Sequence, residues 1–94
     1  MPQIDIDVTH HTESNRFEAH LNGYTAELTY HMSGDTIIFT HTGVPPALEG
    51  QGVGSLLAKT GLEYAKKNNL KVRTLCWFVD GYIQRHVEYQ GLVR

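Results

Sequence analysis

Three glycines alternate with other residues just before a helical pattern begins, and their spacing is the first feature that could do chemistry. Residues 49–57 read EGQGVGSLL, with glycine at positions 50, 52 and 54. Glycines cost backbone entropy and add no side chain to a core. A glycine-rich turn that opens a helix presents free N–H groups at the positive end of the helix dipole, which favours an anion such as phosphate. The alternative is that the glycines only form a tight connection into the helix.

Two nucleotide-binding motifs do not describe this turn. Ser55 stands where a dinucleotide-binding fingerprint has its third glycine, and the rest of the chain has no room for a second mononucleotide-binding half. A P-loop has a lysine after its last glycine, and Ser55 occupies that position as well. The spacing therefore excludes both classes of nucleotide site.

A histidine and a cysteine near the ends of two predicted strands are the candidates for proton transfer or nucleophilic attack. His41 falls near the end of a predicted strand at 36–44, and Cys76 ends a predicted strand at 70–76. A histidine titrates near neutral pH and can act as a base, or it can be a packed histidine. A cysteine can be a nucleophile or a proton donor, or a small buried hydrophobe. Because ligands of open sheets gather beyond the carboxyl ends of parallel strands, we expect both side chains to point into one cleft.

The elements that position these residues begin with antiparallel strands. Alternating apolar and polar residues predict strands at 4–8, 16–21, 24–32 and 36–44, separated by turns at 13–15, 22–23 and 33–35. In the last of these strands the alternation predicts that Ile37, Phe39 and His41 share one face. Pro45 and Pro46 end it, because proline cannot donate to a sheet ladder. Short turns predict an antiparallel meander.

A helix and a parallel strand follow the glycines. An amphipathic stripe predicts a helix from residue 53 to Lys67, and the asparagines at 68 and 69 favour a left-handed stop. The strand at 70–76 should then run parallel to the strand at 36–44, since the helix is long enough for a right-handed crossover. A short helix at 78–86 and a tail complete the chain. The prediction is a single α+β domain over residues 1–94 with a mixed sheet.

Composition narrows the function classes. The chain has 94 residues, a net charge of −2 and one cysteine, which argues against nucleic acid as a partner and suits a reducing cytoplasm. We expect no membrane span and no signal peptide, since no apolar run is long enough and the N-terminus lacks a basic region followed by an apolar one. We also expect no metal site, because His10 and His11 point to opposite faces of a strand, while His20 and His31 lie in separate strands.

Three segments resemble the small single-domain members of the GNAT acyltransferase superfamily. They are HTGVPPALEGQGVGSLL, YAKKNNLKV and LCWFVDGYIQRHVEY, and together the resemblance covers about residues 15 to 93. The segment EGQGVGSLL is similar to the R/Q-x-x-G-x-G/A motif that binds the pyrophosphate of acetyl-coenzyme A in that superfamily. Glu49 departs from the motif, because it stands where arginine or glutamine is usual, and its carboxylate should repel the pyrophosphate.

The resemblance implies where the cofactor would lie. Its pantetheine arm would run along the strand at 36–44, and its phosphates would meet the glycine turn. The implied cofactor-binding residues are Thr42, Gly43, Val44, Pro45, Glu49, Gly50, Gln51, Gly52, Val53, Gly54, Ser55, Cys76, Phe78 and Arg85.

The resemblance also suggests catalytic roles. Cys76 would accept the acetyl group itself or transfer a proton, His41 would act as the base, and Tyr82 would protonate the leaving thiolate. For Tyr82 the alternative is packing of the ring against the sheet. Arg85 and His86 would contact the cofactor or belong to a solvated face. Trp77, Phe78 and Tyr89 would close the core or flank the cofactor.

The expected function is therefore acetyl-coenzyme A-dependent N-acetylation of an amine, on a small molecule or on a protein lysine. Two alternatives stay open. The first is a non-catalytic acyl-coenzyme A-binding or sensing module, suggested by Glu49, and the second is an interaction protein that uses no cofactor.

Overall fold

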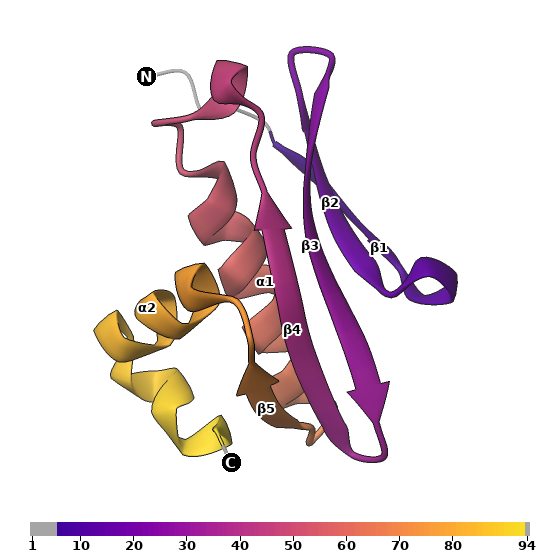
Figure 1. Cartoon of the computed structure of the whole chain (residues 1–94), viewed down its shortest axis with the longest axis vertical. Helices are drawn as coiled ribbons and strands as arrows, with labels where there is room; N and C mark the ends of the chain where they lie inside the picture. Colours follow the sequence, from indigo (N-terminus) through magenta and orange to yellow (C-terminus); the bar gives the residue numbers. More distant parts are fainter. Residues whose placement is uncertain (1–5, 94) are drawn as a thin grey trace.

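One five-stranded sheet with two helices packed against it makes up the fold (Figure 1). A computed structural model describes residues 6–93 of the chain. The strands are β1 (Asp7–His11), β2 (Arg16–Leu21), β3 (Tyr24–Ser33), β4 (Thr36–Gly43) and β5 (Lys71–Thr74). The helices are α1 (Val53–Lys67) and α2 (Trp77–Arg85), and single turns of 3₁₀ helix lie at Thr12–Ser14 and Pro46–Leu48, with a longer 3₁₀ segment at Val87–Leu92.

The predicted α+β mixed sheet is confirmed. The strand order is β1-β2-β3-β4-β5. The pairs β1–β2, β2–β3 and β3–β4 are antiparallel, and the pair β4–β5 is parallel. The hairpin between β2 and β3 turns at Asn22 and Gly23, whose φ values of 54° and 79° suit a tight two-residue connection. Helix α1 begins at Val53 and ends at Lys67, as predicted, and Asn69 adopts the left-handed conformation after it.

Several boundaries differ from the prediction, including the end of β3 at Ser33 rather than 32 and the end of β4 at Gly43 rather than 44. The first strand is β1 at 7–11 rather than 4–8; residues 4 and 5 lie outside the described part, and Ile6 and Val8 still pack against the core. It extends to His11 because the hairpin closes with His11 opposite Arg16, through the 3₁₀ turn at 12–14. Strand β5 ends at Thr74 rather than at 76, and α2 spans 77–85 rather than 78–86, so Cys76 immediately precedes a helix instead of ending a strand.

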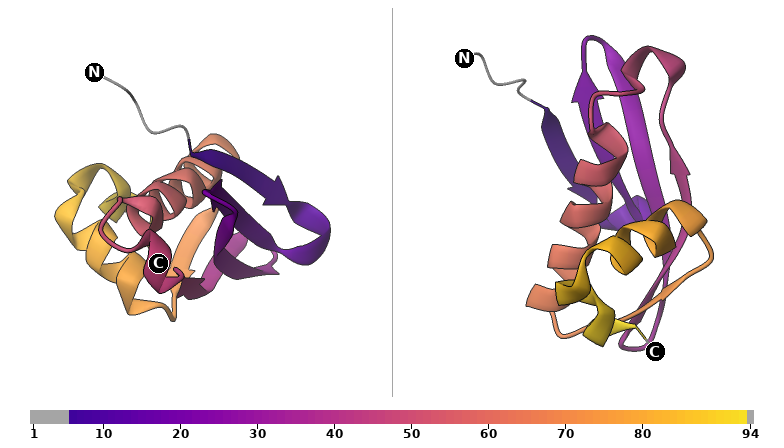
Figure 2. Two further views of the ribbon diagram at one scale, coloured as in Figure 1. Left: turned by 90° about the horizontal axis from the view of Figure 1, so that it is seen from above. Right: turned by 90° about the vertical axis from the view of Figure 1, so that its left-hand side faces the viewer.

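Both helices cover the same face of the sheet, as the side view in Figure 2 shows. Helix α1 contacts β2, β3, β4 and β5, while α2 packs beside it against β4 and β5. Over residues 6–93 the other face of the sheet, which we call the outer face, has no helix on it. The buried face of α1 differs in part from the predicted stripe, because Leu56, Thr60 and Tyr64 are only half-buried, whereas Gly61 and Leu62 are buried.

Gly61 is buried because α1 packs closely against the aromatic side chain of Phe39 in β4. A Cβ at Gly61 would stand 2.8 Å from Cε1 of Phe39 and 3.1 Å from Cδ2 of Leu28, and both of those side chains are fully buried. The small residue therefore sets how closely α1 approaches β3 and β4.

We expect Gly61→Ala to lower the free energy of unfolding by about 1–3 kcal/mol, since overpacking in a closed core forces its neighbours apart. Alanine is the better helix former by about 1 kcal/mol, which partly offsets the loss. Urea denaturation of the variant against wild type measures the difference. Gly91→Ala is the control, because a Cβ there meets nothing within 4 Å. Equal free energies of unfolding for the two variants would contradict the close approach of α1 to Phe39 and Leu28 at Gly61.

Candidate functional site

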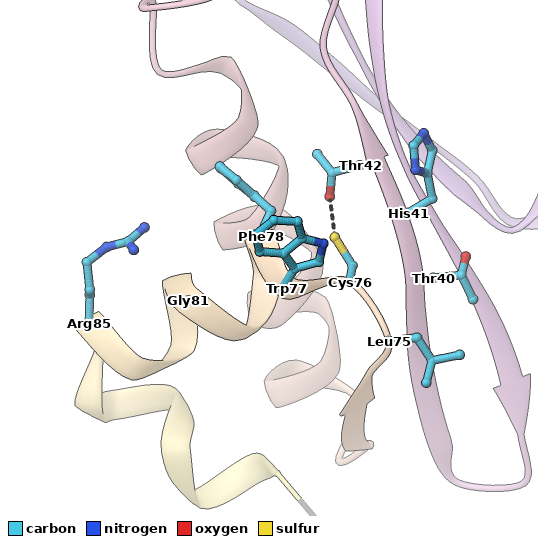
Figure 3. A pocket seen from close by; sticks show the side chains of 9 residues that line it. All are labelled: Thr40, His41, Thr42, Leu75, Cys76, Trp77, Phe78, Gly81 and Arg85. Atoms are coloured by element: carbon cyan, nitrogen blue, oxygen red, sulfur yellow. Dashed lines mark hydrogen bonds between the residues drawn. The ribbon is translucent and has the colours of Figure 1, made fainter.

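Strands β4 and β5 part near their carboxyl ends and leave a cleft between them. Phe39 and Thr74 form the last paired position, and the amide of Leu75 donates to the carbonyl of Phe39 at 2.8 Å. Beyond that bond β4 continues to Gly43 paired only with β3, while the segment after β5 turns into α2. The resulting main cleft has a volume of about 580 Å³ (Figure 3) and is lined by Thr40, His41, Thr42, Leu75, Cys76, Trp77, Phe78, Gly81 and Arg85.

A β-bulge in β4 decides which side chains face which side of this cleft. Tyr30 of β3 pairs with Phe39, but the next residue, Thr29, pairs with His41, so Thr40 is an extra residue in β4. One inserted residue moves every later side chain to the other face. The prediction that His41 shares a face with Phe39 is therefore wrong: His41 lies on the outer face.

The bulge brings Thr42 instead of His41 next to the cysteine. Thr42 pairs with the buried Leu28 and so faces the helices, and its Oγ1 lies 3.2 Å from Cys76 Sγ in a hydrogen bond. Figure 3 shows Thr42 and Cys76 on one side of β4, with His41 and Thr40 on the other. His41 and Cys76 thus line the same cleft, as expected, but they reach it from opposite sides of the strand.

Cys76 is held at the start of α2 by its neighbours. Thr74 Oγ1 accepts a hydrogen bond from the amide of Cys76 at 3.0 Å and donates to its carbonyl at 2.7 Å. The side chain of Cys76 is 8% exposed and its thiol is free. Sγ therefore lies beside Thr42 at the N-terminal end of α2, with little access to solvent.

A second hollow lies over the glycine turn, and we call it the glycine-turn hollow. Its volume is about 270 Å³ and it is lined by Val44, Leu48, Glu49, Gly50, Gly52, Val53, Gly54, Ser55 and Phe78.

The start of α1 leaves backbone donors available at this hollow. Its first helical hydrogen bond is donated by the amide of Leu56 to the carbonyl of Gly52 at 3.0 Å, and no side chain caps the helix. The amides of Val53, Gly54 and Ser55 therefore have no acceptor within the helix. Free amides at the positive end of a helix dipole favour an anionic group.

The glycines of the turn have two different structural causes. Gly50 and Gly52 have φ values of 80° and 77°, a conformation that other residues rarely adopt. At Gly54 the cause is a neighbouring ring: a Cβ there would stand 2.8 Å from Cζ of Phe78, so the half-exposed Phe78 ring would have to move. Phe78 lines both the glycine-turn hollow and the main cleft, so the two are neighbours that share this ring. An elongated ligand that reaches from the free amides to Cys76 would pass Phe78.

Of the remaining predicted cofactor-binding residues, one lines the main cleft and three line neither hollow. Arg85 is exposed and lines the main cleft. Gly43, Pro45 and Gln51 line neither hollow: Gly43 is approached by the ring of His41, Pro45 precedes the turn at 46–48, and Gln51 donates from Nε2 to the carbonyl of Ala47 at 3.2 Å.

Tyr82 lies apart from the predicted catalytic residues. It is buried, stacked on His86 with ring centroids 3.9 Å apart, and it lines neither hollow. Burial raises the pKa of its phenol. The reason is helical periodicity: Gly81 and Arg85 face the cleft, and a residue one position after Gly81 is turned about 100° away. The structure therefore favours the packing interpretation of Tyr82 over the role of proton donor.

The high exposure of two apolar side chains at the cleft was not predicted. Leu75 and Trp77 are 76% and 89% exposed, although both are large and apolar. Trp77 flanks the cleft, whereas Tyr89 belongs to the core, where its hydroxyl donates to Glu63 at 2.6 Å. Sequence patterns carry no signal for such exposure, because an apolar residue next to a strand end is usually buried.

Comparison with known proteins identifies relatives over nearly the whole chain. The family model described as GCN5-related N-acetyl-transferase matches residues 16–92. Protein NATD1 of Xenopus tropicalis is 32% identical, over 99% of this chain and 88% of that protein, and human Protein NATD1 is 34% identical, over 95% and 81%. The solution structure of a GCN5-like protein from Staphylococcus aureus is 33% identical and superposes with a TM-score of 0.71, covering 100% of this chain and 91% of that one. Across residues 6–93, no helix is long and apolar enough to span a membrane.

Proposed function

The chain belongs to the GCN5-related N-acetyltransferase family, and on that premise we propose that it transfers the acetyl group of acetyl-coenzyme A to the nitrogen of an amine. The observation that carries the proposal is the run of space from the free amides at the start of α1, past Phe78, to the Thr42–Cys76 pair. Phosphates suit the first end of this run and a thioester suits the second.

The residues present fit the cofactor at the phosphate end. Gly50 and Gly52 keep the approach to the turn free of side chains, and the amides of Val53, Gly54 and Ser55 supply donors. Arg85 offers a cation at the cleft. Acetyl-coenzyme A supplies the activated acetyl group when it is bound.

Because of the bulge, the two proton transfers of the proposed reaction take place on opposite sides of β4. An amine that approaches from the outer face meets His41, which takes the proton that the nitrogen loses. On the helix side Cys76 gives a proton to the leaving thiolate, and the hydroxyl of Thr42 hydrogen-bonds the sulfur of Cys76. The proton that His41 takes and the proton that Cys76 gives keep the reaction balanced, and solvent resets both groups.

We favour direct transfer over an acetyl-cysteine intermediate. Direct transfer needs no covalent enzyme intermediate, so positioning of the amine against the thioester supplies much of the rate, worth roughly 7–11 kcal/mol in well-oriented reactions. Cys76 is already engaged by Thr42 and nearly buried, which suits a proton donor.

The acceptor side is open, and we propose a protein lysine as the acceptor. Within residues 6–93 no helix covers the outer face of the sheet, so the side of the cleft next to His41 is accessible to a large partner. A single free thiol suits a reducing compartment, and for that reason we propose a cytoplasmic location.

Acetyl-coenzyme A should raise the melting temperature of the protein. At about 100 times its dissociation constant a ligand adds about 2.7 kcal/mol of stability. For a domain of this size that corresponds to a rise of roughly ten degrees or more. Thermal denaturation with and without the cofactor measures the rise, and adenosine is the control without the pyrophosphate. The absence of a rise would reject both catalysis and the alternative of a non-catalytic acyl-coenzyme A module.

Glu49→Gln should tighten cofactor binding. The carboxylate of Glu49 lines the glycine-turn hollow and is exposed, so its repulsion of a pyrophosphate is screened and modest. We expect the dissociation constant for acetyl-coenzyme A to fall about two- to fivefold in low salt and the gain to shrink in high salt. Glu88→Gln is the control, an exposed carboxylate outside both hollows. A gain of the same size in the control would assign the effect to net charge.

A further inference from the structure

The apolar rim of the main cleft has no partner in the described chain. Leu75 and Trp77 stand on either side of Cys76 in the sequence, and both are among the most exposed large apolar side chains of residues 6–93. Neither contributes to the core. Exposed apolar groups gathered at a cleft typically mark a binding surface.

A third hollow continues from the main cleft across Leu75, and we call it the outer hollow. Its volume is about 450 Å³ and its lining is Ile38, Arg73, Thr74, Leu75, Asp80 and Val93. Leu75 lines both spaces, so it separates two adjacent depressions. Side chains two residues apart in an extended peptide point the same way, about 6.5–7 Å apart. Two depressions divided by one side chain therefore suit an extended polypeptide better than a single small amine.

The charges around these spaces do not attract a basic ligand. Among the described residues that line the main cleft none carries a carboxylate, whereas Arg85 does carry a positive charge. In the outer hollow Asp80 is the acidic group; Arg73 lies beside it in the lining, and Gln84 donates to its Oδ2 at 2.9 Å. A peptide with several lysines or arginines would meet Arg73 and Arg85 there, and Glu27, the carboxylate beside His41 on the outer face, is already paired with Arg16 at 3.0 Å.

We propose that the acceptor is a lysine of a polypeptide that has an apolar or aromatic side chain two residues away. The lysine enters the main cleft beside His41, and the apolar side chain occupies the outer hollow against Leu75. Trp77 packs on the peptide from the opposite rim of the cleft. This inference rests on the proposed acetyl transfer and adds the class of acceptor to it.

Matched peptides test the proposal. Each has one lysine, flanked two residues away on both sides by phenylalanine in one peptide and by arginine in the other, and a small amine such as phenethylamine is the third acceptor. We expect kcat/KM to favour the phenylalanine peptide over the arginine peptide by about tenfold. Leu75→Ala should remove most of that preference and leave the melting shift with acetyl-coenzyme A unchanged. Val87→Ala is the control, because Val87 is a 75% exposed aliphatic residue that lines none of the three hollows.

A binding measurement keeps this test independent of turnover. Trp77 is the only tryptophan of the chain, so its fluorescence reports on the rim directly. With coenzyme A present, the phenylalanine peptide should shift the emission to shorter wavelengths and the arginine peptide should not. A shift without acetylation would support this acceptor class and reject the proposed catalysis. A preference for the arginine peptide, an unchanged preference in Leu75→Ala, or acetylation of phenethylamine alone would overturn the acceptor class and leave the transferase function standing.

Discussion

Ser55→Glu should weaken acetyl-coenzyme A binding about 100-fold while leaving helix α1 at least as stable as before. Ser55 is exposed, lies in the first turn of α1 and lines the glycine-turn hollow, where its amide is one of the three free donors. Two like charges about 5 Å apart repel by about 3 kcal/mol at a surface-like effective dielectric. A carboxylate at position 55 would feel more of this repulsion than Glu49 does, because the amide of residue 55 is itself one of the proposed phosphate donors.

The same carboxylate should favour the helix, because negative charge in the first turn interacts well with the dipole, by about 0.3–1 kcal/mol. Stability and binding are therefore expected to move in opposite directions, which no simple unfolding effect produces. Calorimetric titration and urea denaturation of the same preparation measure the two quantities. Ser55→Gln is the control of similar size without charge, and we expect it to lose less than about tenfold in affinity. Equal affinities of the two variants would show that the pyrophosphate lies elsewhere.

Cys76→Ala should lower kcat by about 100-fold or more, the range in which loss of a general acid or base usually falls. Among the described residues that line the cleft, Cys76 carries the only sulfur, and it lies 3.2 Å from Thr42 Oγ1, so its loss removes both the proposed proton donor and the partner of that hydroxyl. Cofactor affinity should change little, because the free amides of α1 are untouched. Steady-state kinetics and the melting shift with acetyl-coenzyme A check the two halves of this prediction.

Cys76→Ser separates the two possible roles of the sulfur. Under direct transfer the serine hydroxyl still accepts and donates hydrogen bonds beside Thr42, so part of the activity should return relative to alanine. Wild-type protein mixed with acetyl-coenzyme A and no amine should then show no mass increase of one acetyl group. A trapped acetyl group on Cys76 would replace the direct mechanism with an acetyl-cysteine one. A Cys76→Ala variant with full activity would remove Cys76 from the mechanism altogether.

The glycine turn and the fold were predictable from the sequence because their signals are local. The period-two strands, the crossover and the bounds of α1 follow from apolar spacing and from turn residues such as Asn22 and Gly23, and the structure confirms them. The glycines of residues 50–55 predict either a backbone anion site or a tight connection into the helix, and the structure leaves three amides there without an acceptor in the helix.

The orientation of His41 could not be predicted, because it depends on pairing between strands. The bulge at Thr40 arises where Thr29 of β3 pairs with His41 instead of Thr40, and no residue type in β4 signals that insertion. Its consequences are large: it moves His41 to the outer face and places the hydroxyl of Thr42 against Cys76. The direction of the Tyr82 side chain could not be predicted either, because it depends on where the short helix α2 begins. A shift of one residue turns every side chain of a helix by about 100°.

The most direct test of the proposed acetyl transfer is a count of acetyl groups in a single reaction. Purified protein is mixed with acetyl-coenzyme A and a lysine peptide; the released coenzyme A thiol is titrated, and the acetylated peptide is measured by mass spectrometry. We expect equal amounts of thiol and acetyl-lysine, both lost in His41→Ala and Cys76→Ala. Cofactor binding with no thiol released for any amine would contradict it, and would identify the protein as an acyl-coenzyme A-binding module that keeps the fold without the transfer.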